Sequence, residues 1–171
     1  LHTKAAKGPS HTNYLKLLTR LDYGTSGIVL AATTPESEAV FREQEHAGNI
    51  TKWYLAVVRG VLDRELYIPN RLDMNKRVKS RVLDFPDPDS ARHTMAFPIA
   101  VIPDENTTLI RVRIRRGARH QIRAHLAFMG FPLANDAMYG DKDATPGYSF
   151  LLHHFRMCTP KFTVTAFPDW E

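Results

Sequence analysis

One segment of the chain sets a single carboxylate among residues that could position it for chemistry. It runs from residue 20 to residue 27 and reads RLDYGTSG. If the backbone is extended around Asp22, the side chains of Arg20 and Asp22 project to one side and that of Leu21 to the other. The glycines in this segment allow another part of the backbone to approach closely. The segment therefore predicts either a carboxylate held beside a cation or an ordinary turn in which Asp22 caps its own backbone.

A second segment gathers positive charge at the start of a predicted helix. Residues 115–123 read RRGARHQIR and hold four arginines. The free N–H groups at a helix start attract anions, so this composition favours phosphate as a ligand. Arg119 and Arg123 would share a helix face, with His120 nearby, so that one arginine could hold a carboxylate while the others contact a nucleic-acid backbone. The alternative is a solvated basic face that serves solubility only.

Aromatic and histidine residues suggest fewer kinds of chemistry. Tyr54 and Trp53 lie in an apolar, strand-like run and could stack on a nucleobase. Aromatic residues in strands, however, commonly belong to the core. The histidine pairs at 153–154 and 120/125 lack the spacing or the flanking carboxylate of a helical metal motif. No nucleophile elbow, phosphate-binding loop or dinucleotide fingerprint is present, so the sequence predicts neither a metal nor a cofactor.

The elements that must position these residues alternate irregularly along the chain. Helices are predicted at 35–46, after a Thr-Pro start and before a Gly48 cap, and at 120–129, before Gly130 and Pro132. Strands are predicted at 27–33, 52–60, 109–115 and twice within 149–166, and residues 63–93 form a long basic excursion with short strands. In the strand at 109–115 the apolar side chains of Ile110, Val112 and Ile114 alternate with Arg111, Arg113 and Arg115, which makes one sheet face positive. This order favours an α+β fold.

Composition narrows the class of protein and of partner. The chain has 171 residues, 43% of them hydrophobic and 24% charged, which predicts one globular domain. A formal net charge of +5 favours a polyanionic partner. The single cysteine, Cys158, excludes an intramolecular disulfide and favours a reducing compartment, the cytoplasm. The longest apolar runs are too short to span a membrane.

Taken together, four sequence blocks resemble the RluA-type family of RNA pseudouridine synthases. They match the family's R-L-D-x-x-T-S-G, K-x-Y-x-A-x-V-x-G, H-Q-I-R-x-H-L and P-x-x-G-D-x-x-Y-G motifs, in the family's order. In this chain the blocks lie at 20–27, 52–60, 120–126 and 132–140. The departures are Thr19, where the family usually has histidine, Ala118, where many members have arginine, and Asn135, where glycine is common. The family's opening strand normally ends in Lys-Pro just before the region where this sequence begins, and residues 1–171 are expected to lack it.

The resemblance implies a catalytic role for three residues. Asp22 would be the carboxylate that acts at C1′ of the target uridine, either as a nucleophile or as a base on a sugar intermediate. The bond between C1′ and N1 of uracil would break, the detached uracil would rotate, and a new bond would form between C1′ and C5. The reaction would need no cofactor and involve no redox change. Tyr54 would stack on the flipped base, and Arg123 would pair with Asp22 and keep it ionised and oriented.

Three further residues are implied in RNA binding. Arg20 would fill the stack that the flipped base leaves, and Arg119 and His120 would contact nearby phosphate. The implied protein is a cofactor-independent isomerase that acts on structured RNA, either ribosomal RNA or transfer RNA, without an obligate protein partner. Residues 1–171 would form a single catalytic domain, with a mixed, mostly antiparallel β-sheet, a few flanking helices and a central cleft.

Two alternatives remain open at this level. A domain without turnover could use the same arginines to bind structured RNA through phosphate contacts. A DNA-binding protein is less favoured, because neither a helix-turn-helix nor a zinc-finger spacing is present.

Overall fold

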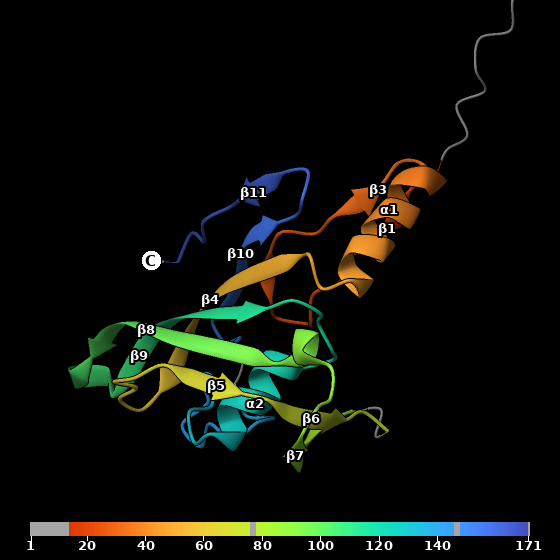
Figure 1. Cartoon of the computed structure of the whole chain (residues 1–171). Coiled ribbons are helices and arrows are strands. Elements are labelled where there is room, and N and C mark those ends of the chain that lie inside the picture. Colours follow the sequence, from red (N-terminus) through yellow and green to blue (C-terminus); the bar gives the residue numbers. More distant parts are fainter. Residues whose placement is uncertain (1–13, 76–77, 146–147, 171) are drawn as a thin grey trace, which may run out of the picture.

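The structure is a computed structural model that describes residues 14–75, 78–145 and 148–170. In this part of the chain, seven strands form one sheet, and all of the pairings in it are antiparallel except that of β2 with β10 (Figure 1). The sheet runs in the order β11 (Thr163–Thr165), β10 (Leu152–Cys158), β4 (Thr51–Arg59), β9 (Thr107–Ile114), β8 (Thr94–Ile102) and β5 (Leu66–Ile68), with β2 (Ser26–Gly27) beside β10. The α+β class and the mostly antiparallel sheet are thus confirmed.

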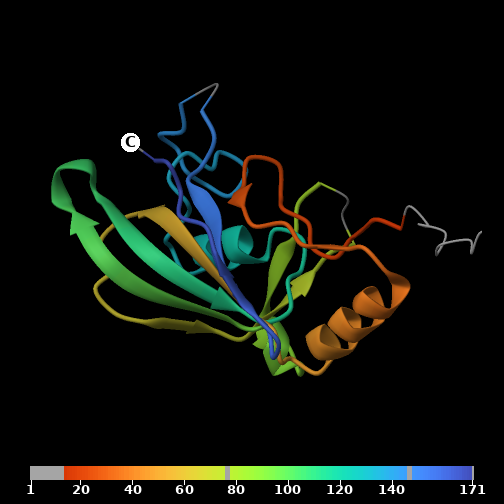
Figure 2. The same cartoon turned by 90° about the horizontal axis from the view of Figure 1, so that it is seen from above.

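Smaller elements complete the fold around this sheet (Figure 2). Two short antiparallel ribbons pair β1 (Lys16–Leu17) with β3 (Ala31–Ala32) and β6 (Asn70–Asp73) with β7 (Arg81–Pro86). The helices are α1 (Pro35–His46) and α2 (Gln121–Phe128), and single turns of 3-10 helix lie at Ser90–Arg92 and Pro103–Glu105. The short strands predicted in the basic excursion are therefore present. Neither of the α-helices in the described ranges is long and apolar enough to cross a membrane.

Local sequence explains why α1 begins and ends where it does. The Thr34 hydroxyl accepts a hydrogen bond from the Ser37 amide, the Ser37 hydroxyl accepts one from the Thr34 amide, and Pro35 occupies the first helical position. Gly48 follows the helix with φ of +73°, the left-handed conformation that ends helices at low cost. The helix predicted at 35–46 is confirmed.

The buried strand predicted at 27–33 is wrong. The segment is divided between two sheets, because Ile28 N donates to the carbonyl of His154 while Leu30 O accepts from the amide of Leu18. Only the two-residue strands β2 and β3 result, and Val29 between them is 47% exposed. An apolar, β-branched run indicates extended backbone but does not determine which partner strand it pairs with.

The second helix also differs from its prediction. It begins at Gln121 rather than at His120, which adopts a left-handed conformation with φ of +55° just before it. Every residue from Gln121 to Leu126 is buried, so α2 has no single apolar face, and Met129 lies beyond its end. The reason is its position: α2 contacts both β8 of the main sheet and β7 of the small ribbon.

The main core lies between α2 and one face of the sheet. It contains alternate residues of β4 and β9 together with apolar residues of α2. The alternation predicted for β9 is confirmed, since Ile110, Val112 and Ile114 are buried and Arg111 is exposed on the opposite face. This packing leaves one sheet face for the core and the candidate site and the other face for solvent.

Candidate active site

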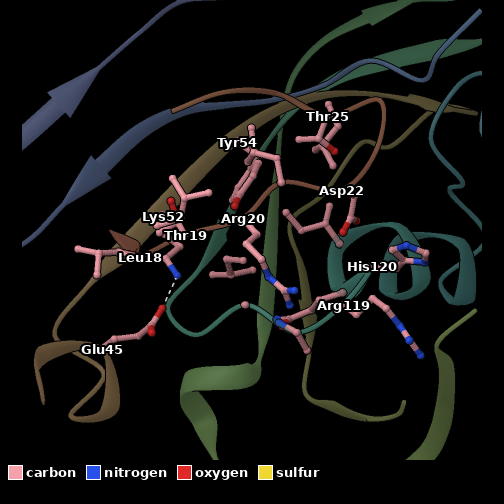
Figure 3. A pocket seen from close by; sticks show the side chains of 18 of the residues that line it. Leu18, Thr19, Arg20, Asp22, Thr25, Glu45, Lys52, Tyr54, Arg119 and His120 are labelled. Carbon is pink, nitrogen blue, oxygen red and sulfur yellow. Dashed lines mark hydrogen bonds and ion pairs between the residues drawn. The ribbon is translucent and has the colours of Figure 1, made fainter. Parts of the chain in front are cut away.

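A cleft of about 620 Å³ opens where the loop before β2, strand β4 and the segment before α2 meet (Figure 3). Of the six residues predicted for the site, five line this cleft: Arg20, Asp22, Tyr54, Arg119 and His120. The sixth residue, Arg123, is buried beneath the cleft and contacts Asp22 from the protein interior. The fold therefore brings together residues that are up to 103 positions apart, from Arg20 to Arg123.

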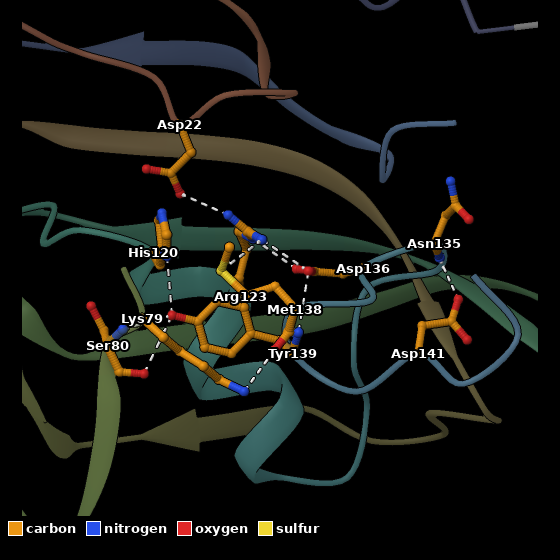
Figure 4. Close-up of polar contacts among 10 residues, drawn as sticks. All are labelled: Asp22, Lys79, Ser80, His120, Arg123, Asn135, Asp136, Met138, Tyr139 and Asp141. Carbon is orange, nitrogen blue, oxygen red and sulfur yellow. Dashed lines mark hydrogen bonds and ion pairs between the residues drawn. The ribbon is translucent and has the colours of Figure 1, made fainter. Parts of the chain in front are cut away.

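The Asp22 loop is held by its own backbone and by the sheet. Thr25 N donates to the carbonyl oxygen of Asp22 at 2.9 Å, which closes the turn. Directly afterwards, β2 pairs in parallel with β10, and Ser26 Oγ lies 2.8 Å from Nδ1 of His153. The Asp22 carboxylate points toward Arg123, with its Oδ2 4.0 Å from Nη1 (Figure 4). The arrangement favours the positioned carboxylate over a turn that the Asp22 side chain caps.

Gly27 explains why the loop can approach the sheet so closely. A Cβ at this residue would lie 2.4 Å from the carbonyl oxygen of His154 and 2.7 Å from its amide nitrogen, at a backbone φ of +111°. No larger residue fits without moving β2 away from β10. Because Asp22 lies only five residues earlier, the position of the Asp22 loop depends on this contact.

The change Gly27→Ala is expected to lower the free energy of unfolding by about 3 kcal/mol, since it combines a left-handed alanine with an overpacked contact. Gly130→Ala is the matched control: Gly130 has φ of +87°, and a Cβ there meets nothing within 4 Å. The control is expected to lower the free energy of unfolding by about 1–2 kcal/mol, because it adds only the cost of a left-handed backbone conformation for alanine. Urea denaturation of the two variants measures both. Equal losses would show that the close contact with β10 contributes nothing.

Tyr54 occupies the floor of the cleft. Its side chain is 8% exposed, and its ring stacks on that of His154 with centroids 4.6 Å apart and planes 17° from parallel. Burial, followed by the negative charge of Asp22, raises the pKa of the Tyr54 hydroxyl, so that it stays protonated. Burial also lowers the pKa of His154 to about 4, and its neutral ring donates from Nδ1 to the carbonyl of Ile28 at 2.7 Å. Tyr54 is therefore both a core residue and a rigid, neutral surface of the cleft.

Trp53 does not join Tyr54 in a stacking surface. Neighbouring residues of a strand point to opposite faces of the sheet, and Trp53 packs against Phe97 on the face away from the cleft. The predicted pairing of these two aromatic rings is wrong for that reason.

Arg123 is fixed by a carboxylate that the sequence reasoning did not assign to the site. Its Nε donates to Asp136 Oδ2 at 2.7 Å and its Nη2 to Asp136 Oδ1 at 2.9 Å, a two-pronged contact that leaves Nη1 facing Asp22 (Figure 4). Both partners are at most 5% exposed. The guanidinium also lies over the rings of Phe150 and Tyr139, at 4.3 and 5.0 Å. Asp136 belongs to the fourth sequence block, so the sequence shows an aspartate at this position. The sequence does not show that Arg123 is its partner.

The four arginines of residues 115–123 do not converge on the helix start. Arg116 pairs with Asp89 and with the carbonyl of His46, away from the cleft, and Arg115 is exposed beyond the end of β9. Arg119 precedes the helix, so it shares no helical face with Arg123; its Nη2 donates to the carbonyl of Met74 at 2.9 Å. The predicted cluster is wrong because the backbone turns sharply between Gly117 and the first helical residue.

The rim of the cleft keeps its positive character. Arg20 is exposed, and together with Arg119 and His120 it lines the cleft around Asp22 (Figure 3). Burial lowers the pKa of His120, partly against the effect of the Asp22 charge, and its Nδ1 lies 3.1 Å from the Tyr139 hydroxyl. At the far end, Lys52 is nearly buried and pairs with Glu45 at 2.6 Å. In the described residues no cluster of three or more histidine, cysteine or acidic side chains could hold a metal ion.

Comparison with known proteins places the chain in a family. Residues 2–128 match the family model described as RNA pseudouridylate synthase. The chain is 33% identical over 136 residues to the ribosomal large subunit pseudouridine synthase C of Haemophilus influenzae. This alignment covers 76% of this chain and 40% of that protein. It is 29% identical over 148 residues to the dual-specificity RNA pseudouridine synthase RluA of Vibrio cholerae, with 84% and 59% covered. The chain thus spans only part of the length of these relatives.

The fold agrees with this assignment. The solved structure of human RNA pseudouridylate synthase domain containing 1 superposes with a TM-score of 0.74 over 92% of this chain and 70% of that one, at 20% identity. The family match covers well over half of the chain and includes Asp22, Tyr54 and Arg123. The chain therefore belongs to the RNA pseudouridylate synthase family, as an RluA-type member.

Proposed function

We propose that this chain is the catalytic domain of an RNA pseudouridine synthase that isomerises uridine in structured RNA without a cofactor. One observation carries the proposal. The Asp22 carboxylate lies in an open, positively rimmed cleft, 4.0 Å from an arginine whose other donors are occupied by Asp136. An acid held in this way can act on one face of a bound sugar while its orientation stays fixed.

In the proposed reaction the target uridine leaves its stack and enters the cleft. Tyr54 supports the flipped base, and Arg20 occupies the space that the base vacates. Arg119 and His120 contact phosphate at the rim, where positive charge offsets part of the cost of unstacking, a few kcal/mol.

Asp22 then acts at C1′, either by attack on the carbon or by proton removal from a sugar intermediate. The bond from C1′ to N1 breaks, the uracil turns, and a bond forms between C1′ and C5. The hydrogen on C5 leaves as a proton and N1 gains one, so the product is an isomer of the substrate. The neutral floor made by Tyr54 helps to keep water away from the detached base.

The class of RNA is the next part of the proposal. The H. influenzae relative is named for the large ribosomal subunit, which supports ribosomal RNA as the first substrate to test, with transfer RNA as the second. A cytoplasmic location, the absence of an obligate protein partner and the assignment of residues 1–171 to one domain stay predictions from the sequence.

Tritium release tests the proposed chemistry. Ribosomal RNA and transfer RNA, each transcribed with uridine labelled at C5, are incubated separately with the chain. Every uridine that is isomerised must lose the label to water, and nuclease digestion followed by mass spectrometry must show an equal amount of pseudouridine. Salt-sensitive RNA binding without tritium release from either RNA would instead support the non-catalytic binding domain.

A further inference from the structure

A second basic surface lies on the face of the sheet opposite the cleft. We name it the arginine–aromatic face and define it by six residues: Trp53, Tyr67, Phe97, Arg111, Arg113 and Arg156. They come from five neighbouring strands, and the strand registers place them on one side: Arg156 and Arg113 flank Trp53, and Phe97 faces Arg111. The core elements that pack on the other side, α2 among them, do not cover this face (Figure 2).

The arginines of this face are not neutralised by the protein. Among the described residues, no ion pair involves Arg111, Arg113 or Arg156, whereas Arg116 and Arg123 each pair with an aspartate. Three guanidinium groups without a carboxylate partner on one face attract a polyanion.

The guanidinium planes are also held for stacking. The Arg111 guanidinium carbon lies 4.6 Å from the centre of the Trp53 ring and 5.3 Å from that of Phe97, and Arg113 lies 5.8 Å from the Trp53 ring. A cation above an aromatic ring is stabilised there, so Arg111 loses little freedom when a base stacks on its outer surface. Tyr67, 57% exposed, adds a further ring at the edge of the face.

The face and the candidate active site are built in part from the same two strands, β4 and β9. Lys52 and Ile114 are paired across β4 and β9, and both line the cleft. The next pair along the same strands is Trp53 with Arg113, on the opposite face. The cleft and the arginine–aromatic face are therefore one residue apart along β4 and β9, on opposite sides of the sheet.

We propose that the arginine–aromatic face binds single-stranded RNA that flanks the structured target. Unpaired bases offer the planes that arginine and aromatic side chains stack on, and the phosphates meet the guanidinium groups that have no carboxylate partner. Base-paired RNA conceals those planes within its own stack. The identity of the ligand rests on the proposed function, but the binding site does not include a residue of the cleft.

Fluorescence anisotropy with two labelled RNAs tests this site. One probe is a hairpin with single-stranded flanks of roughly ten nucleotides, within the length that single-strand-binding surfaces cover, and the other is the same hairpin with blunt ends. The flanks are expected to tighten binding about tenfold. The double change Arg111→Gln with Arg113→Gln is expected to remove this gain and to reduce the slope of log affinity against log salt by about 1.4, the value for two single-strand phosphate contacts.

Two further variants separate charge from stacking. Arg64→Gln with Lys142→Gln removes the same charge from exposed loops outside the face and is expected to keep the gain from the flanks. Arg111→Lys is expected to keep the salt slope and lose most of the gain, because an ammonium group has no plane for a base. The proposal is overturned if the double arginine variant behaves like the loop control.

Tryptophan fluorescence gives a readout that is independent of turnover. The chain has two tryptophans, and Trp170→Phe leaves Trp53 as the only one. The flanked RNA is expected to quench Trp53 and the blunt hairpin to leave it unchanged; no quenching by the flanked RNA would contradict the site. Tritium release is scored separately on the blunt hairpin. Flank binding without turnover would refute the proposed function alone, and turnover without a flank effect would refute this inference alone.

Discussion

The change Asp22→Asn is expected to reduce tritium release by at least about 10³-fold while the affinity for RNA stays within a few fold of the parent. The amide keeps the size and the position of the side chain in the cleft, but it can neither attack C1′ as a carboxylate nor accept a proton at that carbon. RNA binding is preserved because the proposed contacts with RNA, the filling of the vacated stack by Arg20 and the phosphate contacts of Arg119 and His120, come from residues that the change does not replace. Single-turnover tritium release and anisotropy on the same RNA measure the two effects.

A control and a folding measurement accompany this variant. Asp63→Asn removes an exposed carboxylate from the loop before β5 and is expected to leave tritium release unchanged. The melting temperature of Asp22→Asn is expected to stay close to that of the parent, since Arg123 keeps both of its bonds to Asp136. Losing RNA binding and turnover together would assign Asp22 to folding or binding rather than to chemistry, and full tritium release would refute its catalytic role.

The change Arg123→Lys is expected to lower kcat about 100-fold, although the positive charge is retained. The guanidinium uses Nε and Nη2 on Asp136 and presents Nη1 to Asp22, at 2.7, 2.9 and 4.0 Å. A single ammonium group cannot hold both carboxylates in these directions, so Asp22 loses its orientation. The lost charge-assisted hydrogen bond is also expected to cost about 1.5–3 kcal/mol of stability.

The stability cost alone could lower activity, so a second arginine serves as the matched control. Arg59 donates from Nε to Asp141 at 3.0 Å, outside the cleft, and Asp141 is almost fully buried. Arg59→Lys weakens a similar pair and is expected to keep kcat near that of the parent at a temperature where both variants are folded. If the two lysine variants lose turnover equally, Arg123 acts through stability and does not position Asp22.

The sequence blocks predicted most, but not all, of the residues that form the candidate site. Asp22, Tyr54 and Arg123 were named from the resemblance, and the structure brings all three together at the cleft. Asp136 stands in the last block and was not given a role. Its carboxylate reaches Arg123 because the chain reverses after α2, between residues 128 and 136, and no spacing rule connects a helix with the loop that follows its end.

Charge was the least reliable guide. The dense run of arginines at 115–123 suggested one anion site, but Arg116 pairs with Asp89 and Arg123 with Asp136, both with buried or half-buried atoms. Composition records how many charges a segment has. Only the packing of the chain decides which of them meet an opposite charge and which are left for a ligand.

By itself, the sequence determined the features whose causes are local. The Thr34-Pro35 start and the Gly48 end of α1 depend on neighbouring backbone groups, and the alternation of β9 follows from the two-residue period of a strand. The tertiary structure alone decided that residues 27–33 divide between two sheets, that Gly27 touches β10 and that Trp53 and Tyr54 serve opposite faces. These outcomes depend on contacts between segments far apart in the chain, whose free energies are set by packing and not by any short stretch of residues.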